Sequence, residues 1–415
     1  MANTNVFETK LSRRMQVQRY STPVFAAQAS FEERENLVDG QAVVRPTFAT
    51  LYADSYTRGT DMTEQGYTEA SETLTVNQTP AILLRADKWD ALQHKTNLQQ
   101  RLASDGMRAI NKHIDADYLA EVANATSTVD DGDVGGSAGT PITLDSTNII
   151  QIFPAVQRKL QLLDVDIVAA KDPRPQMGNM KPGGGAGFAN LAPYVNEQLV
   201  YALASRETVD GDLVGGNGYR RSYFEFDNFV STNGYWTGTL EMATNPTNLD
   251  TVVINGVTFT FVTSIGSTAG NLLIQATVDL TRALLRDIIT TPSTATSANN
   301  VVLTQASQDA LRRFTATNNN TADEMTLTAQ GYGHIVVSET LTAAADVWSS
   351  EVAHQMFGQK GAVDMVMQSA VDVEISDIPK QFGKYVKPRC LYGIQTFTEG
   401  KEALVDVQIN SAAWV

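Results

Sequence analysis

The feature that most constrains this chain is a long helical pattern from residue 88 to about 125. Its apolar residues recur at steps of four or eight and form one stripe: Leu98, Leu102, Ile110, Ile114, Tyr118 and Val122. Asp87 is expected to cap the helix, with Asp90 in the first turn. At about 1.5 Å per residue this helix is about 50 Å long, well beyond the usual length. The pattern predicts a rod with one apolar side and a bend at Gly106.

Two β-like runs precede this helix, at residues 43–58 and 73–84. Phe48, Tyr52 and Tyr56 alternate on one face of the first run, and residues 59–72 between the runs are rich in Gly, Thr and Glu. The pattern predicts a long two-stranded ribbon with a polar tip. Because an isolated two-stranded ribbon is marginally stable in water, we expect it to pack on another molecule.

The remainder of the chain predicts a mixed α/β body. Helices are expected at residues 145–163, 191–204 and 344–357. Strands are expected at 223–230, 371–375, 384–386, 391–397 and 403–409. The acidic stretch 129–140 and the Pro- and Gly-rich stretch 173–185 are expected to be loops.

From about residue 238 to 345 the composition shifts toward Thr, Asn and Ala. Asn255 and Gly256 separate two β-branched runs, which is typical of a hairpin with a type I′ turn. A helix at 277–289 is expected, followed by short strands at 301–303, 314–317, 325–328 and 335–338. We therefore expect a self-contained α+β module, inserted into the host domain.

The net charge of −15 argues against a sequence-specific DNA-binding protein. The amino-terminal arm differs, because its basic residues face only Glu8: Lys10, Arg13, Arg14 and Arg19. We expect a solvated tail there, with contact to nucleic acid or an acidic partner as the alternative. The single cysteine, Cys390, excludes an internal disulfide and a Cys-based zinc site. Neither a signal peptide nor a membrane-spanning run is expected, and the chain is expected in a cytoplasm.

The order of arm, ribbon, long helix, mixed body and closing strands resembles the major capsid proteins of tailed bacteriophages. The most telling stretches are 74–84 (LTVNQTPAILL), which leads into the helix, and 381–386 (QFGKYV), 391–393 (LYG) and 403–409 (ALVDVQI) near the end. The hairpin of 250–262 with its following helix is similar to a small module found in various phage virion proteins.

The resemblance implies an α+β fold of the Hong Kong 97 type and a division into five parts. These are an N-arm (1–45), an E-loop ribbon (46–87), a spine helix with the first part of the peripheral and axial domains (88–240), an insertion domain (241–345) and a return to the axial and peripheral core (346–415). It also implies self-assembly into hexamers and pentamers of an icosahedral shell around double-stranded DNA, with a portal and without a membrane.

Two departures from relatives define the subtype that the resemblance implies. Some relatives crosslink an E-loop lysine to a neighbour, but residues 42–87 contain no lysine, so this chemistry is not expected. Some relatives also carry a long cleavable scaffold at the amino end. The arm here is too short for one, which implies a separate scaffolding protein.

No set of residues predicts a catalytic, cofactor or metal site. Gly183–Gly187 lacks the Lys-Ser/Thr of a phosphate loop, and the 266–270 stretch lacks the frame of a nucleophile elbow. The acidic groups lack calcium-loop spacing and are expected to be solvated, with a weak cation site at a subunit junction as the alternative: Asp130, Asp131, Asp133, Asp210 and Asp212. The histidines form no ligand pair: His94, His113, His334 and His354. Cys390 is expected to be a buried strand residue, and Trp348 and Trp414 are expected to serve packing.

Two other functions stay open at this point. A tail-tube or decoration protein is one, but such a protein rarely needs both a long ribbon and a long helix. An encapsulin-like compartment shell would share the capsid fold. An enzyme is not expected, because the sequence offers neither a catalytic constellation nor a signal peptide.

Overall fold

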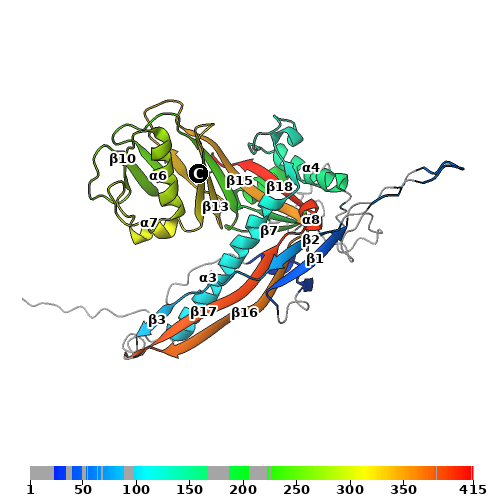
Figure 1. Cartoon of the computed structure of the whole chain (residues 1–415), viewed down its shortest axis with the longest axis horizontal. Coiled ribbons are helices and arrows are strands. Elements are labelled where there is room, and N and C mark those ends of the chain that lie inside the picture. The colour runs from blue at the N-terminus through cyan, green and yellow to red at the C-terminus, as the bar shows by residue number, and fades with distance from the viewer. Residues whose placement is uncertain are drawn as a thin grey trace, which may run out of the picture.

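A computed structural model describes residues 23–33, 40–48, 53, 55–62, 64–66, 69–87, 98–163, 165, 187–204, 222–223, 226–379, 381–412 and 414. All structural statements below concern these residues. Helices and strands are mixed along the chain, and Figure 1 shows a broad body from which a narrow arm and a ribbon extend.

A nine-stranded sheet forms the centre of the body. Its main path runs β12 (Phe314–Asn319), β13 (Glu324–Gln330), β8 (Tyr235–Glu241), β15 (Trp348–Gln359), β5 (Gly187–Leu191), β7 (Phe226–Val230) and β6 (Ser222–Tyr223). Strand β18 (Leu404–Asn410) joins β15, and β4 (Ser127–Val129) joins β18 in parallel. β15 is hydrogen-bonded along both of its edges, which makes it the central strand.

The predicted helix at 344–357 is therefore wrong, since β15 occupies most of this stretch. Ala353, Met356 and Phe357 are all buried, so the strand has apolar side chains on both faces. A strand buried on both faces lacks the alternation that identifies strands in a sequence. Tertiary pairing with β8 and β18 determined the outcome here, and local propensity did not.

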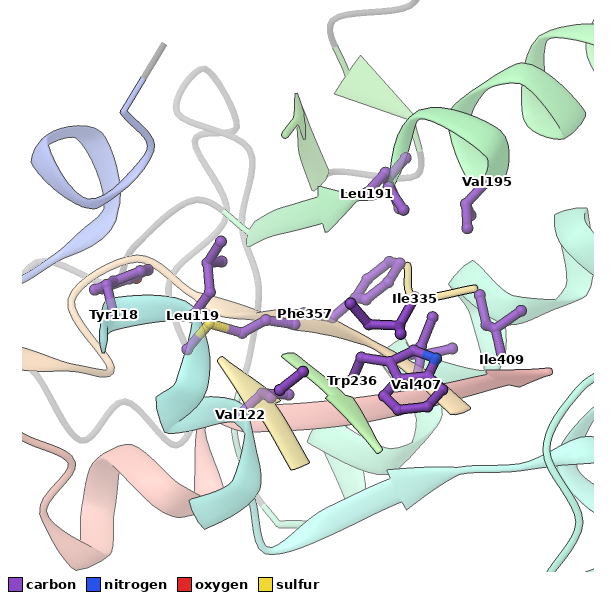
Figure 2. Close-up of a cluster of buried hydrophobic side chains, with 14 of the residues drawn as sticks. Tyr118, Leu119, Val122, Leu191, Val195, Trp236, Ile335, Phe357, Val407 and Ile409 are labelled. Carbon is purple, nitrogen blue, oxygen red and sulfur yellow. The ribbon is translucent and has the colours of Figure 1, made fainter. Parts of the chain in front are cut away.

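Two helices cover this sheet where they were expected. α4 (Asn148–Leu162) packs against β18, β4 and α5 (Pro193–Ala204). Phe153 of α4 meets Phe226 and Phe357 of the sheet edge to face, with ring centroids 6.1 and 5.4 Å away. Figure 2 shows Trp236, Phe357, Val407 and Ile409 in the same core, with Leu191 and Val195 nearby.

The long helix is confirmed as α3 (Leu98–Ala120), which a 3₁₀ turn (Glu121–Asn124) extends. Residues 88–97, with Asp90, lie outside the described part, and Asp87 is the last residue of a strand. The helix continues through Gly106. A Cβ at this position would lie 2.5 Å from Cγ of Pro388, so the glycine permits the helix to approach the neighbouring strand closely.

That neighbouring strand belongs to a three-stranded arm alongside α3 (Figure 1). Its order is β16 (Asp364–Asp377), β17 (Gly383–Gln395) and β3 (Leu84–Asp87), all antiparallel. The strands predicted at 371–375 and 384–386, and most of that at 391–397, are parts of these longer strands. α8 (Thr398–Glu402) then leads into β18, the strand predicted at 403–409.

The ribbon is confirmed over part of its predicted length. β1 (Ala42–Phe48) pairs with β2 (Glu69–Thr75), in a register that sets Ala42 opposite Thr75 and Phe48 opposite Glu69. The predicted second strand at 73–84 is wrong beyond residue 75, because the chain there leaves β1 and pairs with β17. Gln78 bridges to Tyr392 and Ala81 to Arg389 before β3 begins. The predicted tip is also too long at its end, since residues 69–72 lie in β2.

Most of the predicted elements of the 241–345 segment are present. A four-stranded sheet has the order β11 (Asn271–Leu273), β10 (Val257–Val262), β9 (Thr251–Ile254) and β14 (Val337–Glu339). Asn255 and Gly256 both have positive φ, 49° and 77°, as the predicted type I′ turn requires. α6 (Val278–Thr290) is the predicted helix, α7 (Gln305–Ala310) is additional, and residues 301–303 belong to no strand.

This segment is not self-contained, contrary to expectation. Its strands β12 and β13 continue the central sheet, since β13 pairs with β8 from Glu324 opposite Glu241 to Gln330 opposite Tyr235. The buried apolar side chains of the segment and of the body form one contiguous cluster. The boundaries 241 and 345 themselves stay a prediction.

Candidate functional site

The part of the ribbon farthest from the body is exposed throughout. We call residues 55–62 and 64–66 the ribbon tip; every one of them is exposed to solvent. Two large apolar side chains are among them, Tyr56 at 63% exposure and Met62 at 72%. Two carboxylates, Asp61 and Glu64, flank Met62. Figure 1 shows the segment that links β1 to β2 extending away from the rest of the molecule.

The base of the ribbon is packed on its own subunit. Leu74 and Val76 are buried in a small apolar cluster with Val366 of β16 and Phe397, separate from the main core. Val76 also donates its backbone N–H to the carbonyl of Gln41 at 2.9 Å. The expectation that the whole ribbon lacks a partner in its own subunit is therefore wrong at the base.

Polar contacts hold the same base on both strands. Arg45 of β1 lies 2.8 Å from Glu33 and 3.5 Å from Asp364, with its guanidinium 4.4 Å from the centroid of the Phe397 ring. Glu72 of β2 accepts hydrogen bonds from the N–H and hydroxyl of Thr398 at 2.8 and 2.7 Å. Burial acts to raise the pKa of Glu72, but these two bonds outweigh it and the pKa lies below its usual range. The contacts of the described residues thus fix the ribbon at its base.

A second attachment holds a part of the predicted N-arm (1–45). Asp115 of α3 accepts the backbone N–H groups of Val24 and Phe25 at 2.7 and 3.2 Å, and the side-chain amide of Asn233 at 2.9 Å. Burial of Asp115 raises the pKa of its carboxyl although all three bonds oppose this. The short helix α1 (Phe25–Gln28) is thereby fixed against α3. Residues 1–22 lie outside the described part.

A charged cluster joins α3, the three-stranded arm and the 241–345 segment. Asp117 of α3 is ion-paired with Arg313 and accepts a hydrogen bond from the Tyr392 hydroxyl of β17, while His113 Nδ1 lies 3.4 Å from its carboxylate. Burial acts to raise the pKa of Asp117, but the bond to His113 and the charge of Arg313 outweigh it and lower the pKa. Burial and Asp117 raise the pKa of Tyr392. The cluster fixes three parts of the chain to one another.

A pocket of about 430 Å³ opens beside this cluster. It lies between α3, the stretch 80–82 and the residues that follow α7. Its apolar lining includes Ile82, Ala109 and Ile110, and its charged lining consists of three cations and one carboxylate: Lys112, Arg312, Arg313 and Asp309.

The other residues singled out in the sequence have structural surroundings. Cys390 is buried in β17, as predicted, and burial raises the pKa of its thiol to about 11. His354 lies between Asp406 at 2.8 Å and Thr237 at 2.9 Å on the central sheet, contacts that no sequence pattern predicted. Trp414 is buried and stacks on Tyr194 with ring centroids 5.0 Å apart. His94 lies outside the described residues.

The acidic stretch after β4 is more ordered than predicted. Asp130 and Asp133 form a reciprocal capping box around a 3₁₀ turn (Asp131–Val134), and Asp131 accepts the N–H of Ser137 at 2.9 Å. Asp133 also pairs with Arg158 and Lys159 at 2.6 and 3.0 Å. These carboxylates thus hold their own loop. Asp210, Asp212 and Gly183–Gly187 lie outside the described part.

Among the described residues, no three His, Cys, Asp or Glu side chains gather as a metal site would require. No helix within the same residues combines the length and hydropathy of a bilayer-crossing segment.

Neither a protein-family model nor any curated protein matches the chain. Solved structures do match it over nearly its whole length. One from Mycobacterium phage Che8 has 11% identity and a TM-score of 0.55, with 98% of each chain covered. The head structure of Helicobacter pylori bacteriophage KHP40 has 12% identity and a TM-score of 0.51, with 98% of this chain and 96% of the other covered. The chain has the fold of these phage structures, and the predicted mixed α+β fold is confirmed. The Hong Kong 97 type is consistent with these matches.

Proposed function

We propose that this chain is the structural subunit of an icosahedral phage capsid, which assembles into hexamers and pentamers around double-stranded DNA. The observation that carries the proposal is the match of nearly the entire chain to the phage KHP40 head structure. A fragment or a single shared domain would not give 98% and 96% coverage of the two chains. The function needs no catalytic site and no cofactor, and its location is the virion shell.

The ribbon supports this function on physical grounds. Its base is held on its own subunit by a buried cluster and by Arg45 and Glu72. Its tip presents Tyr56 and Met62 to water, which is unfavourable for an isolated subunit. Contact with neighbouring copies would remove these side chains from water. The pre-fixed base lowers the entropy that such contact costs.

Several finer points belong to the same proposal. We infer a separate scaffolding protein and a portal as partners, and DNA that fills the lumen without sequence-specific binding, as the net charge of −15 favours. The division into five parts, at 1–45, 46–87, 88–240, 241–345 and 346–415, is also proposed. An encapsulin-like shell would share the fold and is the main alternative. A tail-tube or decoration role is not favoured, because the match is to a head structure.

The test is to purify the full chain, with and without the neighbouring gene products from its own genome, and to examine it by negative-stain microscopy and mass photometry. Closed shells of uniform diameter are expected. Open tubes, or monomers at every concentration tested, would contradict the proposal. Shells that enclose a cellular protein in place of DNA would favour the compartment alternative.

A further inference from the structure

We infer that the pocket between α3, the stretch 80–82 and the residues after α7 binds a small organic anion, namely a carboxylate or a phosphate that carries a short apolar tail. The inference goes beyond the proposed function and does not depend on it, because it concerns a cavity lined by one chain. The volume of about 430 Å³ lies in the range of about 300–1,000 Å³ that is typical of small-molecule sites. A folded partner is too large for it.

One face of α3 lines the pocket with small side chains. Ala109, Lys112, His113 and Ala116 lie at positions i, i+3, i+4 and i+7, so they share one face of the helix. The two alanines leave room that larger side chains would fill. The stretch 80–82, which consists of a proline, an alanine and an isoleucine, supplies further apolar surface. An apolar tail would remove this lining from water.

Two residues with a left-handed backbone shape the wall that the 241–345 segment contributes. Arg313 has a φ of 68° and Gly331 a φ of 85°. A Cβ on Gly331 would lie 2.9 Å from Cβ of Ala116, so this glycine lets the segment approach α3 closely. Arg313 adopts a conformation that its side chain disfavours, while its guanidinium pairs with Asp117 and donates to Gln330 at 3.2 Å. Backbone strain of this kind gathers at binding sites.

The pocket carries a positive charge that no described residue neutralises. Of the lysine and arginine side chains that line it, Arg313 is paired with Asp117 and Arg312 lies 2.9 Å from Asp309. Lys112 is exposed and has no ion-pair partner among the described residues. The Arg312 pair is exposed as well, and such pairs are weak enough for the arginine to turn to a ligand. The chain as a whole has a net charge of −15, so this local excess distinguishes the pocket from its surroundings.

An anion with an apolar tail satisfies both parts of the pocket. Its head would approach the ammonium of Lys112, and its tail would cover Ala109, Ala116 and the stretch 80–82. An inorganic ion would leave the apolar lining in water, and a neutral hydrocarbon would leave Lys112 unpaired. The bound molecule would contact α3, the stretch 80–82 and the 241–345 segment at once. It would therefore stabilise the place where these three parts meet.

Titration calorimetry of the full chain with sodium octanoate tests the site. We expect one molecule bound per chain. Octanamide keeps the tail and lacks the charge, and acetate keeps the charge and lacks the tail, so each should bind about tenfold more weakly. Hexyl phosphate distinguishes a phosphate head from a carboxylate head, and saturable binding of either anion supports the inference. Equal affinities for octanoate and octanamide, or binding of neither anion, would overturn it.

Three variants separate the site from general electrostatic attraction. Lys112→Glu should weaken octanoate binding about tenfold. Arg286→Glu makes the same change of charge on α6, outside the pocket, and should leave the affinity unchanged. Ala109→Leu should weaken binding without any change of charge, because it fills the apolar part. Far-ultraviolet circular dichroism checks that each variant is folded. Wild-type affinity in a folded Lys112→Glu variant would contradict the inference.

Protection of one lysine from chemical modification locates the ligand. Acetic anhydride acetylates exposed lysines, and mass spectrometry of the digested chain gives the rate at each position. Saturating octanoate should slow the acetylation of Lys112 severalfold. Lys384 is exposed on β17 and outside the pocket, so its rate should stay the same. Equal protection of both lysines, or of neither, would rule out the pocket as the site. Such a result would leave the proposed function intact, since shell formation is measured separately.

Discussion

The central sheet and the β1–β2 ribbon both contain antiparallel pairs, yet they differ in how fully their strand edges are hydrogen-bonded and their side chains buried. β15 is hydrogen-bonded on both edges and buries Ala353, Met356 and Phe357. Within the described residues β1 pairs only with β2, and most of the side chains of β2 are exposed. The difference teaches that stability and assembly are assigned to separate parts. The sheet is stabilised within the subunit itself, and under the proposed function neighbouring copies would cover the exposed part of the ribbon.

The largest effect should come from the ribbon tip. Replacement of residues 59–66 by a short Gly-Ser link should abolish shell formation, because the tip would be the part that contacts a neighbour. The free energy of unfolding, measured with urea, should change by less than about 0.5 kcal/mol, since exposed residues away from packed features contribute little. Normal shells from this variant would show that the ribbon tip is not needed for assembly. A large loss of stability would show that the tip is part of the fold.

The converse substitution is in the sheet. Trp236 is fully buried and its indole N–H donates to Ser411 at 2.9 Å. Trp236→Ala should cost about 3–5 kcal/mol of unfolding free energy, as the removal of a large core side chain does. Urea denaturation followed by far-ultraviolet circular dichroism measures this. At low temperature, where the variant remains folded, its shells should still form.

A smaller effect on stability is expected where the three-stranded arm, α3 and the 241–345 segment meet. Asp117→Asn should lower the unfolding free energy by about 2 kcal/mol at neutral pH, because it leaves Arg313 without its charge partner. The pKa of Asp117 is lowered in the folded state, so its favourable contribution is present above the ordinary value of 3.8 and is lost as the pH falls through the folded-state value. The difference in unfolding free energy between wild type and variant should therefore shrink on acidification below about pH 5.

Asp115 provides the matched control for this pH dependence. Its pKa is raised in the folded state, so its contribution to stability is greatest below the ordinary value of 3.8 and declines as the pH rises through the folded-state value. The gap between wild type and Asp115→Asn should widen on acidification, opposite in sign to that for Asp117. Chemical denaturation at a series of pH values measures both. If the differences in unfolding free energy for both variants changed in the same direction with pH, the opposite pKa shifts of Asp115 and Asp117 would be wrong.

The smallest effect concerns Gly106. In an exposed helix Gly→Ala stabilises by about 1 kcal/mol through helix propensity. Here the new Cβ would lie 2.5 Å from Cγ of Pro388, so we expect Gly106→Ala to destabilise the chain by about 1 kcal/mol instead. Gly106→Ala/Pro388→Ala should recover the loss. A stabilised single variant would show that α3 and β17 are not tightly packed.

Much of the fold could be predicted from residue patterns, where local chemistry and tertiary structure agree. The Asn255-Gly256 turn has the dihedral angles that its residues favour, and α4 and α6 follow their apolar periodicity. β15 could not be predicted, because burial on both faces removes the alternating pattern. The continuation of the second ribbon strand onto β17 was missed for another reason: pairing partners distant in sequence leave no local signal.

The candidate site was only half predictable. The ribbon follows from alternation and from its polar tip, both of which are local properties of 43–84. The pocket brings together residues near positions 81, 112 and 312, and no spacing in the sequence indicates such a meeting. The role of Asp117 could not be predicted either. In the sequence it is one of several polar residues on the long helix, and only the fold brings Arg313 and Tyr392 beside it.

The passage of one backbone stretch from β2 to the edge of β17 has a mechanical consequence. Residues 69–75 are bonded to β1, and the residues directly after them are bonded at 78 and 81 to β17. A pull on the outer end of the hairpin is therefore transmitted through Leu74 and Val76 to the strand that lies beside the long helix. Strain applied to the ribbon of a subunit would therefore reach the three-stranded arm of that same subunit.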